Sequence, residues 1–125
     1  MTGYIVFAHG SSVESANDAV RAVARELAER GQFELVAAAF LEGGEPNLND
    51  AARELAARGA RRLRVVPYFL TLGLHLQRDL PKLIAQARLA VPGIEIESTA
   101  PLDGHPAVVD ALLDRARSDS ACGPN

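Results

Sequence analysis

The sequence predicts a single small α/β domain, a four-stranded parallel sheet with helices on both faces. Short apolar or β-branched runs alternate four times with segments of helical periodicity, and the connections between them are short. Consecutive βα units of this kind form parallel sheets that helices cover on both faces. The chain has 125 residues, of which 48% are hydrophobic and 23% charged, so one domain with a buried core is expected. We place this domain at residues 1–117 and a flexible tail at residues 118–125.

The first half of the chain predicts two strands and two helices. Residues 4–8 are a compact apolar run of the kind that is buried on both faces of a sheet, and a helix follows over residues 13–30, ended by Gly31. The second strand is expected at residues 33–40, and an asparagine N-cap opens a second helix over residues 47–59. The inward-facing residues are expected to be Ala16, Val20, Val23 and Leu27 in the first helix, and Leu48, Ala51, Ala52 and Leu55 in the second.

The second half repeats the pattern. The third strand is expected at residues 63–67, and the third helix begins near Asp79 with Pro81 in its first turn. A fourth strand at residues 94–98 alternates isoleucine with glutamate, which is typical of a sheet edge. The last helix spans residues 106–117. The third helix is expected to pack through Leu80, Leu83, Ile84 and Ala87.

Composition excludes several classes of protein. The formal net charge of −3 offers no basic footprint for a phosphate backbone, and the low aromatic content, with no Trp, argues against a stacking platform for nucleic acid. The longest apolar stretch, residues 65–76, is interrupted by proline and glycine and is too short to span a bilayer. The first residues lack the basic region of a signal peptide, and the single cysteine, Cys122, fits a reducing compartment. We therefore expect a cytoplasmic protein that binds neither nucleic acid nor membranes.

All three histidines follow predicted strands. His9, His75 and His105 stand in loops that a parallel sheet gathers at its carboxyl edge, where ligands bind. Histidine is the commonest metal-donating side chain and changes charge near neutral pH, so this edge is a candidate metal or proton-transfer site. We expect His105, in the sequence DGHP, to shape the entry to the last helix.

The first two loops each allow two interpretations. In the sequence HGSS, His9 and Ser11 either hold a metal or an anion, or Ser11 or Ser12 caps the helix while His9 faces solvent. In the sequence LEGGEP, Glu42 and Glu45 either serve the site or only complement the dipole of the following helix.

The third loop, residues 68–76 (the apolar loop), is mostly apolar, although loops are usually polar. It suits a flat hydrophobic ligand or a partner subunit, and His75 within it is expected to be partly buried. The competing interpretation is a core histidine bonded to backbone. The nucleophile elbow, the P-loop and the dinucleotide glycine fingerprint are missing, and Ala8 stands where phosphate-transferring histidine enzymes carry arginine.

The order of these motifs resembles a known family. The sequence HGS after the first strand, FLE with EP after the second, and VVPYFL leading to GLH and DLP are similar to the short class II tetrapyrrole chelatases. This group comprises the small sirohydrochlorin cobaltochelatases and their nickel-inserting archaeal relatives, and the resemblance covers residues 4–115. It implies a chelatase-like sheet and insertion of a divalent metal into a sirohydrochlorin-type ring, in cobalamin or siroheme biosynthesis. It also implies a homodimer, because the short forms hold half of what longer chelatases encode.

The resemblance carries over to single residues. His9 matches a metal ligand and proton acceptor, His75 matches the second metal-binding histidine, and Glu42 matches an acidic position near the metal. The residues expected to bind substrate are Ser11, Glu45, Leu70, Thr71, Leu72, Gly73 and Leu74. Two positions depart from the pattern: Ser12 stands where many relatives have arginine, and Leu74 where glycine is common. A contact to a substrate carboxylate is then lost or supplied from elsewhere, with Arg78 and Lys82 as candidates.

The chemistry of these side chains agrees with the roles that the resemblance implies. Two imidazoles and a carboxylate form a borderline site suited to Co²⁺, Fe²⁺ or Ni²⁺, whereas thiolates would hold the ion too tightly to release it. A neutral histidine accepts a proton near pH 7. The metal is expected as a substrate, Co²⁺ first, with no permanently bound cofactor. Two alternatives stay open: a non-catalytic tetrapyrrole or metal carrier, which Ser12 favours, and a subunit that pairs with another chelatase half.

Overall fold

The computed structural model describes residues 1–118 and confirms the predicted fold class. Four strands and four helices alternate along the chain, and all strand pairs are parallel. The strand order is β2-β1-β3-β4, so β4 lies at an edge as predicted. The elements are β1 (Thr2–Ala8), α1 (Glu14–Gly31), β2 (Leu35–Phe40), α2 (Leu48–Ala57), β3 (Arg62–Pro67), α3 (Leu74–Ala90), β4 (Glu95–Ser98) and α4 (Pro106–Ala116).

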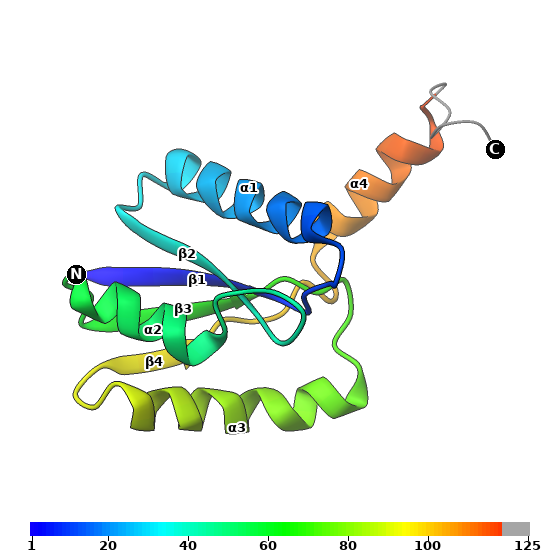
Figure 1. Ribbon diagram of the computed structural model, residues 1–125. Helices are drawn as coiled ribbons and strands as arrows, with labels where there is room; N and C mark the ends of the chain where they lie inside the picture. The colour runs from blue at the N-terminus through cyan, green and yellow to red at the C-terminus, as the bar shows by residue number, and fades with distance from the viewer. Residues whose placement is uncertain (119–125) are drawn as a thin grey trace.

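The helices form two layers around the sheet (Figure 1). Helix α1 packs over β1 and β2 on one face, while α2 and α3 cover the opposite face. Along β1, Ile5 and Phe7 enter the core beneath α2 and α3, and Val6 and Ala8 enter the smaller core beneath α1. Both faces of β1 are therefore buried, which explains why its sequence is continuously apolar.

The inward face of helix α1 agrees with the prediction at Val20 and Leu27 and differs from it at Ala16 and Val23. Ala16 and Val23 are exposed, and the buried positions are instead Asn17 and Ala24, with Val20 and Leu27 half-buried. Neither Ser11 nor Ser12 is the N-cap, because Val13 holds that position without a side-chain bond. Gly31 is the last helical residue, and the left-handed residue that ends the helix is Gln32, with φ of 54°. The buried face thus includes Asn17, whose side chain bonds the backbone of Ser11 and Gly43 in two different loops.

Helix α3 begins at Leu74, five residues before the predicted start near Asp79, so Pro81 lies inside the helix. The early start is stabilised locally, because the Gln77 backbone N–H donates to Gly73 O at 3.0 Å and its side chain donates to Leu72 O at 3.0 Å. The missing N–H of Pro81 is tolerated because Leu80 and Ile84, on either side of it, are buried in the core. The expected packing through Leu80, Leu83, Ile84 and Ala87 is confirmed.

Helix α2 agrees with its prediction in detail. The Asn47 side chain accepts a hydrogen bond from the Asp50 backbone N–H, and this cap fixes the start of the helix. The predicted inward residues are all buried: Leu48, Ala51, Ala52 and Leu55.

Helix α4 spans almost the predicted residues but leaves the body of the protein, extending away from the sheet in Figure 1. None of its residues is buried, and Val109 and Leu112 are each 64% exposed. Of the predicted flexible tail, residues 119–125 lie outside the part that the structure describes.

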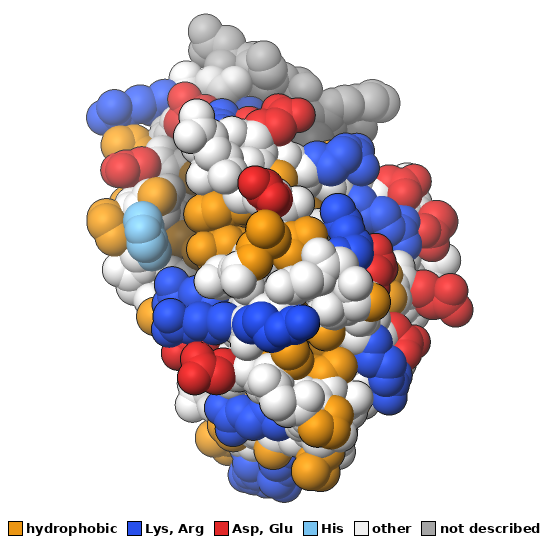
Figure 2. Space-filling view, turned by 90° about the vertical axis from the view of Figure 1, so that its left-hand side faces the viewer, with side chains coloured by type: hydrophobic (Ala, Val, Ile, Leu, Met, Phe, Trp, Pro, Cys, Tyr) orange, Lys and Arg blue, Asp and Glu red, His pale blue; other side chains and the backbone are white. Residues whose placement is uncertain are grey.

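Figure 2 looks at the end of the molecule that carries the N-terminus, and basic and acidic side chains are interspersed on it. Within the described residues, no helix has the length and apolar content needed to cross a membrane.

Candidate functional site

The predicted site residues follow the carboxyl ends of the strands. His9 comes directly after β1, Glu42 lies two residues after β2, and His75 lies in the first turn of α3, beyond β3. Because all four strands are parallel, these positions belong to one edge of the sheet. We call this the carboxyl edge.

His9 and Glu42 meet at this edge. His9 Nε2 lies 3.5 Å from Glu42 Oε1, and the two side chains are 62% and 71% exposed. His9 Nδ1 lies 3.1 Å from Gly10 O, and because a carbonyl only accepts, Nδ1 carries the proton of this hydrogen bond. In the neutral ring Nε2 then keeps its lone pair. Imidazole nitrogen and carboxylate oxygen bind an ion such as Zn²⁺ at about 2.0–2.2 Å, so a 3.5 Å separation allows one divalent ion to contact both atoms.

The backbone holds the two loops that carry this pair against each other. We refer to residues 9–13 as the first loop and residues 41–47 as the second loop. Past the ends of β1 and β2, Leu41 N–H donates to Ala8 O and Glu42 N–H donates to His9 O, both at 2.9 Å. Gly10 makes this approach possible, with φ of 91°, because a Cβ atom there would lie 1.7 Å from Glu42 O. The glycine of the HGS motif is thus required by the contact between the loops.

Two side chains of α1 that sequence reasoning missed also hold the second loop. The Asn17 amide bonds the backbone of both loops, and Arg21 Nη2 donates to Glu45 O at 2.9 Å. Arg21 Nη1 also bonds Glu14 at 2.6 Å and Asp18 at 2.8 Å. The hydrogen bond from Arg21 lowers the pKa of Glu14, and the same bond raises the pKa of Arg21, so the pair is charged at neutral pH. The sequence signal for Asn17 was its position as a polar residue on the otherwise apolar face of α1.

Glu45 is positioned by its backbone, and its side chain is exposed. Together with Glu42 it lines an open acidic cavity of about 630 Å³, to which α2 contributes Asp50 and Glu54. The second loop therefore does more than complement the dipole of α2, since one of its carboxylates faces His9.

His75 differs from the expectation of partial burial, because it is exposed in the first turn of α3. The helix starts earlier than predicted, which turns this side chain out of the apolar loop. The loop itself is anchored at two points: Phe69 packs edge-on against Phe7 with ring centroids 6.1 Å apart, and the Leu72 N–H donates to Asp103 at 3.2 Å.

The tip of the apolar loop faces α4. Leu70 and Thr71 line an apolar groove of about 510 Å³ together with residues along α4 and in the loop before it. Leu70 is 71% exposed, and Leu112 lines the groove from α4. His105 lies here as the N-cap of α4, its Nδ1 accepting from the Ala107 N–H at 3.0 Å, in agreement with the structural role predicted for it.

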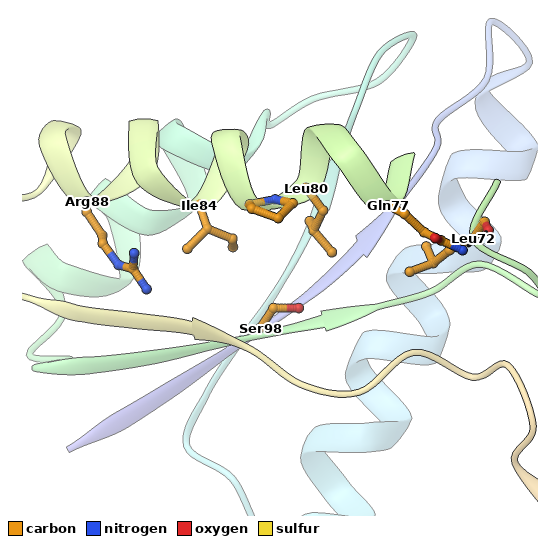
Figure 3. A pocket seen from close by; sticks show the side chains of 7 residues that line it. Leu72, Gln77, Leu80, Ile84, Arg88 and Ser98 are labelled. Carbon is orange, nitrogen blue, oxygen red and sulfur yellow. Dashed lines mark hydrogen bonds between the residues drawn. The ribbon is translucent and has the colours of Figure 1, made fainter. Parts of the chain in front are cut away.

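A second groove, of about 360 Å³, separates α3 from the edge strand β4 (Figure 3). Leu72, Leu80 and Ile84 make it largely apolar, and its one charged group, Arg88, is bonded to Ile96 O. None of the three histidines lines it. Of the predicted site residues, only Leu72 of the apolar loop lines this groove.

The complete predicted donor set does not assemble within one chain. Among residues 1–118, no three His, Cys, Asp or Glu side chains lie close enough together to hold a metal ion. One chain thus presents the His9–Glu42 pair, with His75 elsewhere on the same edge.

Comparison with known proteins places this geometry in a family. The model of the family described as CbiX matches residues 3–119. The chain is 34% identical over 113 residues to the chloroplastic sirohydrochlorin ferrochelatase of Arabidopsis thaliana, covering 90% of this chain and 50% of the plant protein.

Two solved structures share the fold. A structure described as a cobalamin (vitamin B12) biosynthesis CbiX protein of Marinobacter aquaeolei superposes with a TM-score of 0.81 at 29% identity, covering 93% of this chain and 94% of that one. The sirohydrochlorin chelatase SirB of Bacillus subtilis subspecies spizizenii, in complex with cobalt, superposes with a TM-score of 0.84 at 27% identity. That match covers 92% of this chain and 49% of the Bacillus chain, so this chain spans about half the length of some relatives and nearly all of others. The chain belongs to the CbiX family.

Proposed function

We propose that this protein is a metal chelatase that inserts a divalent ion into sirohydrochlorin or a related tetrapyrrole, for cobalamin or siroheme biosynthesis. The observation that carries the proposal is the His9–Glu42 pair, two donors 3.5 Å apart at the carboxyl edge of a CbiX-family sheet. The ion is a substrate, and Co²⁺ is our first choice, with Fe²⁺ and Ni²⁺ as alternatives. One relative is named a sirohydrochlorin ferrochelatase and another was solved in complex with cobalt, and both support this choice of metals. The single cysteine fits a reducing cytoplasm, where we place the reaction.

The reaction exchanges one divalent ion for two pyrrole N–H protons. In the proposed mechanism His9 Nε2 and Glu42 hold the ion until the ring nitrogens replace them. The lone pair of Nε2 that the departing ion frees then accepts one pyrrole proton. Glu42, 3.5 Å away, stabilises the imidazolium that forms. His75 takes the second proton, and the apolar loop supplies the face on which the flat ring rests.

A test follows the absorption of sirohydrochlorin after mixing with protein and Co²⁺. His75→Ala is expected to lower the insertion rate at least about tenfold, because it removes the acceptor of the second pyrrole proton. Gln86→Ala, an exposed position further along α3, is the control and is expected to match the parent. Equal rates in His75→Ala and the parent show that His75 has no part in the reaction. If the parent protein binds the ring and Co²⁺ but does not insert the ion, it is instead a non-catalytic carrier, the alternative that Ser12 favours. Arg78 and Lys82 are then tested as contacts to the ring.

We further propose that the working form is a homodimer. The incomplete donor set of one chain and the double length of the Bacillus relative support two copies acting together. The exposed apolar side chains of α4 support this helix as the contact between the copies: Val109 and Leu112 are both exposed, and Leu112 lines the same groove as Leu70.

Sedimentation equilibrium tests the dimer. The parent is expected at twice the monomer mass of 13.3 kDa, and Leu112→Asp is expected to shift it to the monomer, because a carboxylate is costly to bury in an apolar contact. Leu89→Asp is the matched control, since Leu89 is an exposed leucine on α3, and is expected to leave the mass unchanged. A parent that sediments as a monomer while inserting metal contradicts the proposed dimer.

A further inference from the structure

Asn17 is the one buried polar side chain in the described part of the chain, with 1% of its surface exposed. It lies in the first turn of α1, on the buried side of the helix. A buried amide is retained only where its donors and acceptor are satisfied, since an unpaired polar group in the core is destabilising. Its partners therefore indicate what it does.

Every polar atom of the Asn17 side chain is used. Oδ1 accepts from the Ser11 N–H at 2.9 Å, and Nδ2 donates to Ser11 O at 2.8 Å and to Gly43 O at 3.1 Å. A longer contact of 3.3 Å joins Nδ2 to Glu14 Oε2. The amide thus pairs with Ser11 in both directions and joins the first loop to the second loop.

The space around the amide leaves little freedom. A Cβ atom at Gly44 would lie 2.9 Å from Asn17 Nδ2, and one at Gly43 would lie 2.9 Å from the backbone of Ser11. The two loops are therefore in backbone contact around the Asn17 side chain, which fills the space between them. Aspartate has the same shape, but its oxygens would face the two carbonyls that Nδ2 now bonds.

The loops that Asn17 joins carry the two donors. Ser11 lies two residues after His9, and Gly43 follows Glu42 directly. The donor side chains themselves are exposed, so their separation depends on the backbone that carries them. Within residues 1–118, the side-chain hydrogen bonds that join the first loop to the second loop are those of Asn17.

We propose that Asn17 is a positioning residue, which sets the separation of His9 Nε2 and Glu42 Oε1 by fixing the first loop against the second. It touches neither the ion nor the ring. The inference rests on the proposed function, in that this pair receives the ion. A purely structural role would instead limit the effect of Asn17 to the stability of the fold.

The test compares Asn17→Ala and Asn17→Asp with Ala24→Gly, in the full chain. Ala24 is buried further along the same face of α1, and glycine there weakens the helix while leaving the loop bonds intact. Co²⁺ affinity is measured by titration of the protein alone, together with the visible spectrum of the bound ion, kcat and KM for sirohydrochlorin, and Tm.

Both Asn17 variants are expected to bind Co²⁺ about tenfold more weakly, with an altered spectrum and a kcat lowered about tenfold at nearly unchanged KM. Ala24→Gly is expected to lower Tm while keeping Co²⁺ affinity and kcat within about twofold of the parent. The proposal is overturned if the losses of Co²⁺ affinity and of kcat are in proportion to the loss of Tm in all three variants.

Hydrogen exchange separates this inference from the proposed function. The Glu42 amide donates to His9 O, so its exchange reports how firmly the loops are joined without any metal or ring. We expect exchange at Glu42 to be at least about tenfold faster in Asn17→Asp than in Ala24→Gly at matched stability. If the parent inserts no metal, the proposed function fails, while this comparison still decides the role of Asn17. Equal exchange in the two variants overturns it.

Discussion

His9→Ala is expected to lower the rate of Co²⁺ insertion into sirohydrochlorin by about 10²–10⁴-fold, the range that a positioned acid–base group contributes. In the proposed mechanism one atom, His9 Nε2, both binds the ion and accepts a pyrrole proton, so alanine removes two functions together. In this variant Glu42 is the one member of the donor pair that remains at the carboxyl edge. The measurement is the initial rate of the absorbance change, with Co²⁺ affinity determined separately.

His105→Asn is the matched control for the loss of an imidazole. His105 caps α4 through its ring nitrogen, and asparagine is among the best N-caps, so the helix start is preserved. We expect the rate of this variant to stay within about twofold of the parent. A His9→Ala protein that keeps more than a tenth of the parent rate, after correction for Co²⁺ affinity, rules out His9 as the main proton acceptor.

Gly10→Ala is expected to reduce the free energy of unfolding by about 3 kcal/mol or more and to reduce insertion to background. The alanine Cβ would lie 1.7 Å from Glu42 O at a φ of 91°, so the two loops must separate to admit it. Separation breaks the bond from the Glu42 N–H to His9 O and moves the donors apart. Urea unfolding and the insertion rate measure the two effects.

Gly93→Ala isolates the steric part of that effect. Gly93 has a φ of 85°, and no atom lies within 4 Å of the position that its Cβ would occupy. Alanine there bears only the cost of a left-handed conformation, about 1–2 kcal/mol, with insertion unchanged. If Gly10→Ala and Gly93→Ala lose the same free energy of unfolding, the close contact between the first and second loops is contradicted.

Local signals predicted the fold well. In α2 a capping asparagine and an apolar stripe of helical spacing determine both the start and the buried face, and the structure agrees. The early start of α3 depends instead on bonds from Gln77 to Gly73 and Leu72, and on tertiary packing around a proline. A proline is a strong local signal for the first turn of a helix, and it was misleading here because the core outweighs one missing hydrogen bond.

The candidate site was predicted in its residue types but not in its geometry. The order of the motifs singled out His9 and Glu42, whereas their separation depends on loops brought together by the parallel pairing of β1 with β2. Asn17 escaped notice because one of its partners, Gly43, lies 26 residues further along the chain. The periodicity of α1 alone favoured the neighbouring Ala16 for the buried face.

The Arg88 side chain has a consequence for how copies of the protein associate. Its guanidinium donates two bonds, of 3.0 Å and 2.7 Å, to the carbonyl of Ile96 in the edge strand β4. An open strand edge is a template on which another chain can add a strand, and an occupied carbonyl interrupts that template. The bond from Arg88 to Ile96 therefore makes β4 a poorer template for a strand from a second copy.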